Sequence, residues 1–389
     1  MKIVYLGPIS VAMLASSLEF SCDVPVSRLK YAHGARLVLA LLRRGHEVAV
    51  ITPCEQIMEV RKFRAGNCTL YLIPQRRTRY QMLTFFSKEV RLMVSAINDF
   101  DPDVVFPQWL YQYSRAAIVS GKPCLAVGRD SPWRVAKLMR NFRMWHRTLY
   151  SCFFVSRHIQ NLTTISPYMV DGLMRWWKRK GKGCISVIPN AIPLNDVAKA
   201  NIIRTDAKTI VCVSDWNELK NVKCLIRAFI NLRNRHADWR LIVYGTSMQD
   251  DGACGVWMKS KGFSTEGIDL RGYGKQEEIR KVLLEEADVF CSPTLEESFG
   301  QVFLEAMAQG VPCIGGERSG AVPWVIGGGG VVCDVTDSTK LAECIECVMM
   351  DAGWRKRLSE EGKRRVEEMF DIEKVVDMYE LELRKIAKC

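Results

Sequence analysis

Residues 292–325 read SPTLEESFGQVFLEAMAQGVPCIGGERSGAVPWV, and this stretch decides how the rest of the chain is interpreted. The apolar run 287–291 precedes it and indicates a buried strand. Within it, an apolar helix ends at Gly310, and residues 311–314 predict the next strand. A strand, a loop, a helix and another strand in this order are typical of a parallel α/β sheet, whose ligands bind at the carboxyl ends of the strands. We therefore expect a ligand site at residues 292–300.

Two carboxylates lie near the start of the predicted helix. Glu297 lies in the loop, and Glu305 follows eight residues later, inside the helix. The amides of a first helical turn have no partners within the helix, and the helix dipole makes that end positive, so a phosphate is well placed there. One carboxylate is then positioned for a reacting centre and the other for a ribose. Each acid taken alone is equally explained as an ordinary residue near a helix start.

The combined pattern is more specific. Glu297 and Glu305 with Ser-Phe-Gly between them, then Glu-Ala-Met-Ala-x-Gly-x-Pro and Ser-Gly-x-x-Pro, resemble the donor-site signature of retaining glycosyltransferases of family four. The resemblance covers nearly the whole chain and is strongest over residues 185–380. It implies an α/β protein with the GT-B fold, in which two Rossmann-like domains face each other across a cleft and a C-terminal helix crosses back to the first domain.

Applied to this chain, the resemblance divides it into three parts. It implies an acceptor-binding domain over residues 1–192, a nucleotide-sugar-binding domain over 193–369 and a returning helix over 370–389. A length of 389 residues independently favours two domains, because one hydrophobic core seldom serves so long a chain.

Composition indicates a cytoplasmic protein. The residues are 48% hydrophobic and 25% charged, as in soluble globular proteins, and no apolar run approaches the roughly 20 residues of a membrane span. Residues 1–7 predict a first strand, since their apolar run is too short for a signal peptide. The fifteen cysteines are scattered through apolar runs, which fits a reducing compartment, and we interpret Cys344 and Cys347 as packing residues of a helix, not zinc ligands.

The net charge of +12 predicts an anionic partner. No nucleic-acid-binding motif is recognisable, so we expect no nucleic acid. Basic residues alternate with Trp and Phe in segments 129–147 and 175–182, a composition that suits a membrane surface or a lipid-linked acceptor. Attachment to the cytoplasmic face of a membrane is therefore one hypothesis. Solvated helix faces with a few core aromatics are the alternative.

Family members commonly clamp the donor diphosphate between an Arg and a Lys five residues later. Lys220 matches that Lys, although a surface lysine is the alternative interpretation. The Arg position holds Asp215, which cannot pair with a phosphate. A charge-assisted contact of this kind contributes about 1.5–3 kcal/mol, and Arg318 is our candidate for a cation that offsets its loss. Gly7 ends the first predicted strand, at the expected ligand edge of the first domain.

The resemblance also implies roles for the helix start. Glu297 would lie beside the donor sugar, Glu305 would bind the ribose, and the donor would receive backbone amides. These amides would come from Ser298, Phe299, Gly300 and Gln301. Together with Lys220, the helix end would stabilise the departing diphosphate without a metal. No Asp-x-Asp motif stands at this site, so we expect neither a metal nor another cofactor.

The predicted strand 123–127 leads to Arg129 and Asp130, where the family often has a histidine near the acceptor. We expect Arg129 to bind an acceptor phosphate and Asp130 to orient an acceptor hydroxyl; a salt bridge within the loop is the alternative. The glycine pair that many members carry before their first helix is replaced here by Val-Ser-Arg-Leu at 26–29.

These features predict a retaining, metal-independent hexosyltransferase. Its donor would be a UDP- or GDP-sugar, and its acceptor a hydroxyl of a lipid-linked, polysaccharide or other glycoconjugate precursor. One alternative is a weakly active or non-catalytic donor-binding relative, which Asp215 and the missing glycine pair favour. Another is a nucleotide-sugar epimerase, because one fold hosts many reactions.

Overall fold

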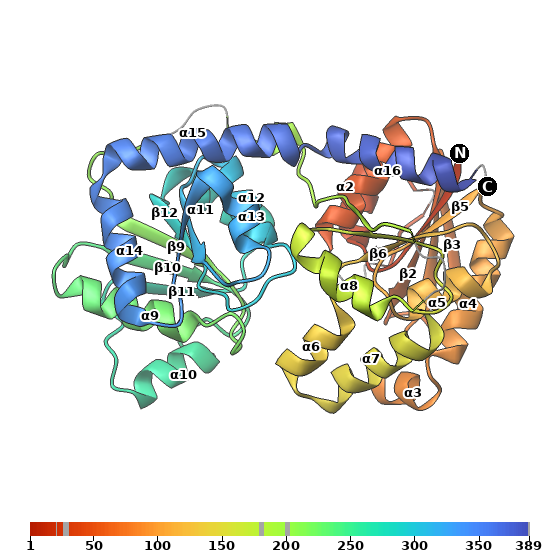
Figure 1. Ribbon diagram of the computed structural model, residues 1–389, viewed down its shortest axis with the longest axis horizontal. Helices are drawn as coiled ribbons and strands as arrows, with labels where there is room; N and C mark the ends of the chain where they lie inside the picture. The colour runs from red at the N-terminus through yellow and green to blue at the C-terminus, as the bar shows by residue number, and fades with distance from the viewer. Residues whose placement is uncertain (21, 26–30, 179–182, 199–202, 388–389) are drawn as a thin grey trace. The chain divides into compact units, whose positions relative to one another are not determined.

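The computed structural model describes residues 1–20, 22–25, 31–178, 183–198 and 203–387. The chain is α/β and divides into two compact units, each with its own parallel-stranded sheets (Figure 1). Unit 1 comprises Met1–Ala191 together with Ile372–Cys389, and unit 2 comprises Ile192–Asp371. The last helix of the chain is thus part of the unit that begins the chain.

Unit 1 is built on a five-stranded sheet of order β3-β4-β2-β1-β5, parallel except for β3. A three-stranded parallel sheet, β6-β7-β8, continues it through single bridges from Val105 to Cys124 and from Gln108 to Val127. The strands are β1 (Lys2–Leu6), β2 (Glu47–Cys54), β3 (Arg61–Ala65), β4 (Cys68–Pro74), β5 (Val104–Pro107), β6 (Leu125–Gly128), β7 (Asn161–Thr164) and β8 (Ser186–Val187). The carboxyl ends of the parallel strands therefore form one continuous edge.

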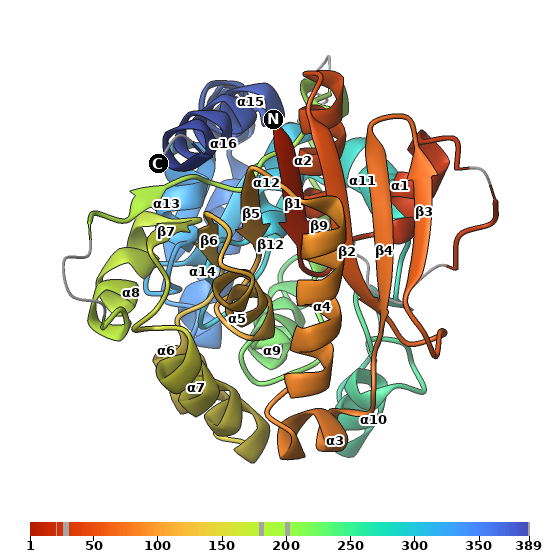
Figure 2. The ribbon, with the colours of Figure 1, turned by 90° about the vertical axis from the view of Figure 1, so that its right-hand side faces the viewer.

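Helices cover the sheets of unit 1, and Figure 2 shows α4 lying across the strands of the larger one. The α-helices are α1 (Val11–Ser17), α2 (Ala32–Arg43), α3 (Thr78–Leu83), α4 (Ser87–Phe100), α5 (Gln112–Val119), α6 (Pro132–Met139), α7 (Phe142–Phe154), α8 (Val170–Trp176) and α16 (Ile372–Ala387). In α2, Leu37 and Leu41 are fully buried at helical spacing, and Gly45 follows with φ +79°.

Two features of unit 1 were not predicted from the sequence. The segment after β1 contains α1, whose start is capped by Ser10 through a 3.4 Å hydrogen bond from Met13 N. The antiparallel hairpin of β3 and β4 was not predicted at all. Arg61, Lys62 and Arg64 are exposed on β3, so this edge strand presents charged side chains to solvent.

The helix α16 is held to unit 1 by both charge and packing. Arg44 donates to Glu373 at 3.0 Å and to Asp377, and His46 contacts Glu380 at 2.5 Å. The buried ring of Tyr379 lies 4.9 Å from that of Phe106 in β5, edge to face. Burial of Tyr379 raises the pKa of its hydroxyl to about 12, so it stays neutral.

Unit 2 is a six-stranded parallel sheet of order β11-β10-β9-β12-β13-β14. Its strands are β9 (Thr209–Val213), β10 (Arg240–Tyr244), β11 (Ile268–Gly272), β12 (Val289–Cys291), β13 (Cys313–Gly316) and β14 (Gly330–Cys333). Its α-helices are α9 (Val222–Arg233), α10 (Ala253–Ser260), α11 (Gln276–Glu285), α12 (Gln301–Ala308), α13 (Val322–Ile326), α14 (Ser338–Met350) and α15 (Ala352–Met369). Strand order reverses between β9 and β12, where open α/β sheets bind ligands.

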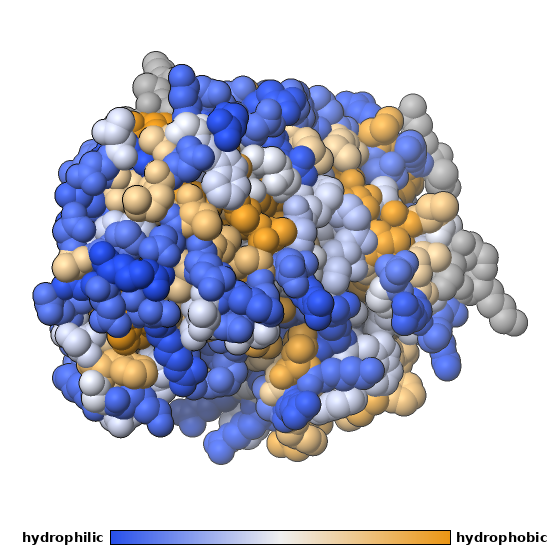
Figure 3. Space-filling view, turned by 60° about the vertical axis from the view of Figure 1, so that its left-hand side comes forward, coloured by the Kyte–Doolittle hydropathy of each residue, from blue (hydrophilic) through white to orange (hydrophobic). Residues whose placement is uncertain are grey.

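None of the helices in the described part of the chain is both long enough and apolar enough to span a membrane. Figure 3 shows one face of the protein, on which hydrophilic side chains predominate and hydrophobic ones gather in smaller patches.

Candidate functional site

Three loops at the carboxyl ends of β9, β12 and β13 are joined by backbone groups. Leu295 N donates to Leu219 O at 2.7 Å, which ties the loop after β12 to the loop after β9. Ala321 N donates to Glu297 O at 3.0 Å, which ties it to the loop after β13. Thr294 lies between them and is fully buried, and its carbonyl accepts the Ser319 hydroxyl at 2.5 Å. This network fixes the backbone of residues 294–297 beside the start of α12.

The predicted pair Lys220 and Glu297 comes together in this network. The Lys220 ammonium forms an ion pair with Glu297 Oε1, and the two side chains are 29% and 17% exposed. The loop after β9 supplies the cation and the loop after β12 the carboxylate. A half-buried cation that pairs with a carboxylate at the site can exchange that partner for a diphosphate oxygen.

The start of α12 is shaped by Gly300 and Gln301. Gly300 caps the helix with φ +93°, a conformation that favours glycine, and an added Cβ there would lie 2.9 Å from the Phe303 ring. Both polar atoms of the Gln301 side chain are buried without a hydrogen-bond partner among the described atoms. Buried amides are normally satisfied, so these two atoms are available to a polar ligand.

The other residues that the sequence predicted for the donor site have different surroundings. The Phe299 ring is buried 5.7 Å from Phe370, so only its backbone is available to a ligand. Ser298 is half-buried at the loop end. Glu305 Oε1 accepts a 3.3 Å hydrogen bond from Gln276 Nε2. Arg318 is 93% exposed and has an acidic neighbour, Glu317, at 3.5 Å, so it is a cation near the site that the fold does not hold in place.

Asp215, which stands at the family's arginine position, has a structural role in this chain. Its Oδ1 accepts a 2.9 Å hydrogen bond from Thr246 N and thereby joins the loops after β9 and β10. Gly245 permits this contact, since an added Cβ would lie 1.8 Å from Ser214 O. The sequence showed only that Asp215 replaces the arginine of the clamp. The contact of Asp215 with Thr246 could not be predicted from the sequence, because it depends on the pairing of β9 with β10.

At the ligand edge of unit 1, Arg129 is buried and mostly occupied. Its Nε donates to Gln108 Oε1 at 2.8 Å and its Nη1 to Asn190 Oδ1 at 2.7 Å. Only Nη2 is left, buried and without a hydrogen-bond partner among the described atoms. Gly7 allows Gln108 to approach, because an added Cβ would lie 2.8 Å from Gln108 Cβ. Arg129 and Gly7 therefore support this edge of the sheet from the interior of unit 1.

Asp130 lines a cavity of about 300 Å³ at the same edge. Pro8, Gln75 and Trp109, which follow β1, β4 and β5, line it as well. The Asp130 carboxylate accepts the Tyr111 hydroxyl at 3.1 Å. Burial raises its pKa, while Arg147 on α7 opposes that shift. The same cavity includes Gln112, Arg143 and Arg147, which sequence reasoning did not connect with Asp130 because helices carry them in from elsewhere.

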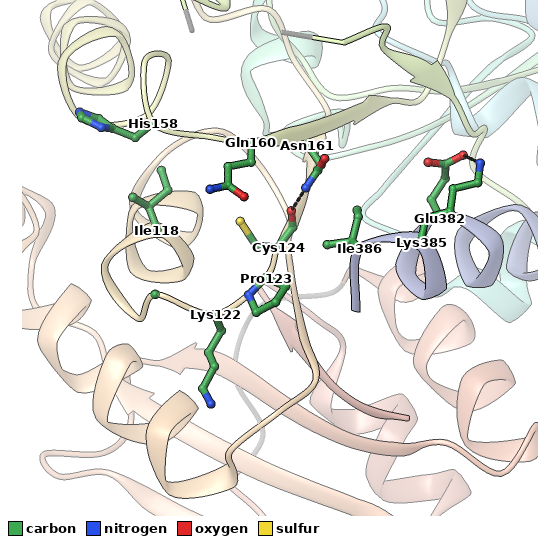
Figure 4. A pocket seen from close by; sticks show the side chains of 11 residues that line it. Ile118, Lys122, Pro123, Cys124, His158, Gln160, Asn161, Glu382, Lys385 and Ile386 are labelled. Carbon is green, nitrogen blue, oxygen red and sulfur yellow. Dashed lines mark hydrogen bonds and ion pairs between the residues drawn. The ribbon is translucent and has the colours of Figure 1, made fainter. Parts of the chain in front are cut away.

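A second cavity, of about 490 Å³, lies at the opposite edge of unit 1 (Figure 4). Cys124 and Asn161, next to the amino ends of β6 and β7, face it, and Asn161 Nδ2 donates to Cys124 O at 3.2 Å. The sequence's Asp101-Pro-Asp103 run lies at this same edge: Asp101 pairs with Lys122, and Asp103 accepts a hydrogen bond from Lys2 N. None of the predicted site residues lines this cavity.

Two sequence-based expectations lie outside the described residues in whole or in part. The Val-Ser-Arg-Leu run at 26–29, where the family has its glycine pair, is not described. Of the basic segment 175–182, only residues 175–178 are described.

Solved structures match the fold over the whole chain. A sucrose-phosphate synthase from Thermosynechococcus elongatus aligns with a TM-score of 0.77 at 17% identity, covering all of both chains. An α,α-trehalose 6-phosphate synthase from Burkholderia multivorans aligns at 0.74 and 12%, covering 100% of this chain and 96% of the other. At such identities the likeness concerns the fold alone, and it confirms the prediction: this is a GT-B protein.

Matches to two family models identify the family of this chain. The model for "Glycosyltransferase Family 4" matches residues 32–196, and that for "Glycosyl transferases group 1" matches residues 195–365. The chain belongs to glycosyltransferase family four, as the sequence predicted. It is 32% identical to an N-acetyl-α-D-glucosaminyl L-malate synthase of Bacillus anthracis over 46% of this chain, and 30% identical to an MMP α-(1→4)-mannosyltransferase of Mycolicibacterium hassiacum over 64%. The matches span 45% and 60% of those relatives' own lengths.

Proposed function

We propose that this protein transfers a hexosyl unit from a UDP- or GDP-sugar to a hydroxyl acceptor, with retention at the anomeric carbon. The observation that carries the proposal is the ion pair of Lys220 with Glu297 at the start of α12, beside the unsatisfied Gln301. Family membership supports a sugar-transfer reaction. The names of the two relatives above contain N-acetylglucosaminyl and mannosyl groups, which supports a hexosyl donor.

In the proposed reaction, the bond between the anomeric carbon and the diphosphate oxygen breaks while the acceptor oxygen attacks from the same face. Negative charge develops on the diphosphate, and Lys220 together with the first amides of α12 stabilises it. The acceptor proton passes to the departing phosphate oxygen. Glu297, once separated from Lys220, faces the positive charge on the sugar ring. Because protein groups supply the positive charge, we propose that no metal takes part.

Asp215 leaves the diphosphate with one fixed cation fewer than the family pattern. Arg318 is the candidate to supply it, since its exposed side chain follows β13 at the ligand edge of unit 2. In this proposal Arg318 becomes ordered when the donor binds. Glu305, which accepts from Gln276 in the absence of a donor, would accept from the ribose hydroxyls instead.

The test is thermal stabilisation by a panel of nucleoside diphosphates and their sugars. A ligand at about 100 times its dissociation constant adds roughly 2.7 kcal/mol of stability, which is a readable shift. We expect UDP or GDP to raise the melting temperature, Lys220→Ala to remove the rise, and Lys356→Ala, which changes an exposed lysine of α15, to preserve it. Absence of any nucleotide-induced shift would contradict the proposal.

A non-catalytic donor-binding relative is the second candidate, and Asp215 is the observation that favours it. The two are separated by incubation with the donor that stabilises the protein best. Slow release of free sugar into water, abolished by Glu297→Ala, supports the transferase. Nucleotide binding without either sugar release or transfer to any hydroxyl supports the relative.

The α6–α7 surface supports peripheral attachment to the cytoplasmic face of an anionic membrane as part of the same proposal. Phe142 and Phe153 are 79% and 67% exposed, whereas a helix face that only meets water would carry polar residues at such positions. The exposed apolar residues of this surface are Trp133, Leu138, Met139, Phe142, Trp145, Leu149 and Phe153, and its exposed basic residues are Arg134, Lys137, Arg140 and Arg143. Apolar side chains enter the lipid interface while the cations meet anionic headgroups.

A further inference from the structure

We infer that the cavity beside Asp130 binds an anionic group of the acceptor, a phosphate or a carboxylate, through Arg143 and Arg147. The inference rests on the proposed function and gives its acceptor a chemical class: a small molecule or headgroup that carries both a hydroxyl and an anion. Asp130 receives the hydroxyl, and the two guanidinium groups receive the anion.

Arg147 is held in place with an unused donor. Its guanidinium carbon lies 4.0 Å from the centre of the Tyr111 ring, so stacking fixes the plane of the group. Its Nε is buried and has no hydrogen-bond partner among the described atoms. A fixed, buried N–H without an acceptor is unfavourable, and an anionic oxygen placed in the cavity removes that cost.

Arg143 adds a second positive charge one helical turn away. It lines the same cavity, and burial together with the charge of Arg147 lowers its pKa. Within the described part of the chain, neither guanidinium forms a salt bridge with a carboxylate within 4.0 Å. The two neighbouring cations repel each other, and an anion bound between them relieves the repulsion.

The remaining polar groups of the cavity suit a hydroxyl. The Asp130 carboxylate is oriented by the Tyr111 hydroxyl, and the Gln112 Oε1 is buried without a hydrogen-bond partner among the described atoms. The Asp130 carboxylate and Gln112 Oε1 are hydrogen-bond acceptors. An alcohol can donate a hydrogen bond to them, and an anion cannot. A volume of about 300 Å³ is at the lower end for ligand pockets, so the bound group is small.

Free metabolites and lipid headgroups share this chemistry, and the probes separate them. Glycerol 3-phosphate and L-malate are soluble hydroxylated anions, glycerol is the neutral control, and phosphatidic acid in phosphatidylcholine vesicles presents the phosphate on a lipid. Calorimetric titration uses the full chain carrying Lys220→Ala, so that phosphate bound by the proposed donor site does not contribute.

Arg143→Gln and Arg147→Gln should each weaken binding of an anionic probe about tenfold or more, the effect of removing one charge-assisted contact. Arg140→Gln is the matched control: it removes the same charge from the exposed α6–α7 surface, and Arg140 does not line the cavity. It should leave binding of the soluble anions unchanged. Arg143 is more exposed than the half-buried Arg147. The Arg143 variant therefore keeps the test open if Arg147→Gln fails to fold.

Binding of a soluble anion that depends on both arginines supports a free acceptor, and vesicle binding with that dependence supports a headgroup. The inference is overturned if no anionic probe binds, if glycerol binds as well as glycerol 3-phosphate, or if Arg140→Gln weakens binding of the soluble anions as much as the cavity variants do. These outcomes are independent of the nucleotide-induced melting shift of the unmodified protein, which tests the proposed function separately.

Discussion

The two units of this protein complete their ligand edges by different means. In unit 2, main-chain groups of Leu219, Leu295 and Ala321 join three loops directly. In unit 1, the Arg129 side chain joins Gln108 to Asn190, and Tyr111 reaches Asp130. A backbone network tolerates most substitutions except at its glycines, whereas a side-chain network depends on each residue in it. The difference predicts that single side-chain substitutions disturb the unit 1 edge more than the unit 2 edge, where the glycines are the sensitive positions.

The largest expected effect is on the reaction itself, at the carboxylate that the unit 2 network holds. Glu297→Gln should lower transfer at least about 100-fold, as the loss of one preorganised charge does, while nucleotide affinity changes far less. Glu343→Gln, which changes an exposed carboxylate of α14, is the control and should keep full activity. Steady-state rates with the stabilising donor measure both. A Glu297→Gln variant with more than a tenth of the original rate would contradict the assigned role.

The next effect compares one glycine from each unit. Gly245→Ala places a Cβ 1.8 Å from the main-chain oxygen of Ser214, which cannot move without separating two strands. Gly7→Ala meets Gln108 Cβ at 2.8 Å, a smaller overlap that a small displacement of the Gln108 backbone relieves. We expect a loss in the free energy of unfolding of roughly 3 kcal/mol or more for Gly245→Ala and about 1–2 kcal/mol for Gly7→Ala. Urea denaturation of both variants gives the values, and equal losses would erase the distinction between the units.

A smaller effect concerns Asp130. Burial raises the pKa of its carboxyl above the usual 3.8, so the folded protein binds this proton more tightly than the unfolded chain does. Stability from this group is therefore present at low pH and is lost as pH rises through the raised pKa. Asp130→Asn should raise the melting temperature at pH 7 by about 1–3 °C, with the gain shrinking towards pH 4. A variant that is less stable at pH 7 would show that the Arg147 charge outweighs burial.

The smallest effect on the fold is expected on the α6–α7 surface. Because Phe142 and Phe153 are mostly exposed, replacing both with Ser should change the free energy of unfolding by only about 0.5 kcal/mol or less for each. Sedimentation with phosphatidylglycerol vesicles should nevertheless fall several-fold. The exposed Met58 on unit 1 provides the control Met58→Ser, which should sediment like the original protein. Unchanged sedimentation of the Phe variants would contradict peripheral attachment.

The sequence predicted two unit 2 strands because each is a short apolar run bounded by glycine, proline or polar residues. The run 287–291 contains β12, and the run 311–314 overlaps β13. The spacing from Glu297 to Glu305 lies within one loop and one helix, so local order is enough to interpret it. Lys220 needed only the knowledge that β9 and β12 are neighbours, which the family resemblance implies.

The unit 1 cavity could not be predicted in the same way. Pro8, Gln75, Trp109, Asp130 and Arg147 come from five separate segments, and only tertiary packing brings them together. Arg129 was predicted to bind a ligand because it follows a strand, but the sequence cannot show that Gln108 and Asn190 already occupy two of its nitrogens. The hairpin of β3 and β4 was missed because its charged edge strand lacks an apolar pattern.

The membership of α16 in unit 1 has a consequence for synthesis on the ribosome. Unit 2 is one continuous segment, whereas unit 1 lacks the helix that covers Phe106 until residues 372–387 have been translated. At about 5–20 residues per second, translating the intervening unit takes on the order of 10–40 s. We expect the nascent first unit to wait, with this apolar surface uncovered, until the segment translated last completes it. Residues 192–371 form one continuous segment, so the unit that is translated second is complete in sequence before the unit that is translated first.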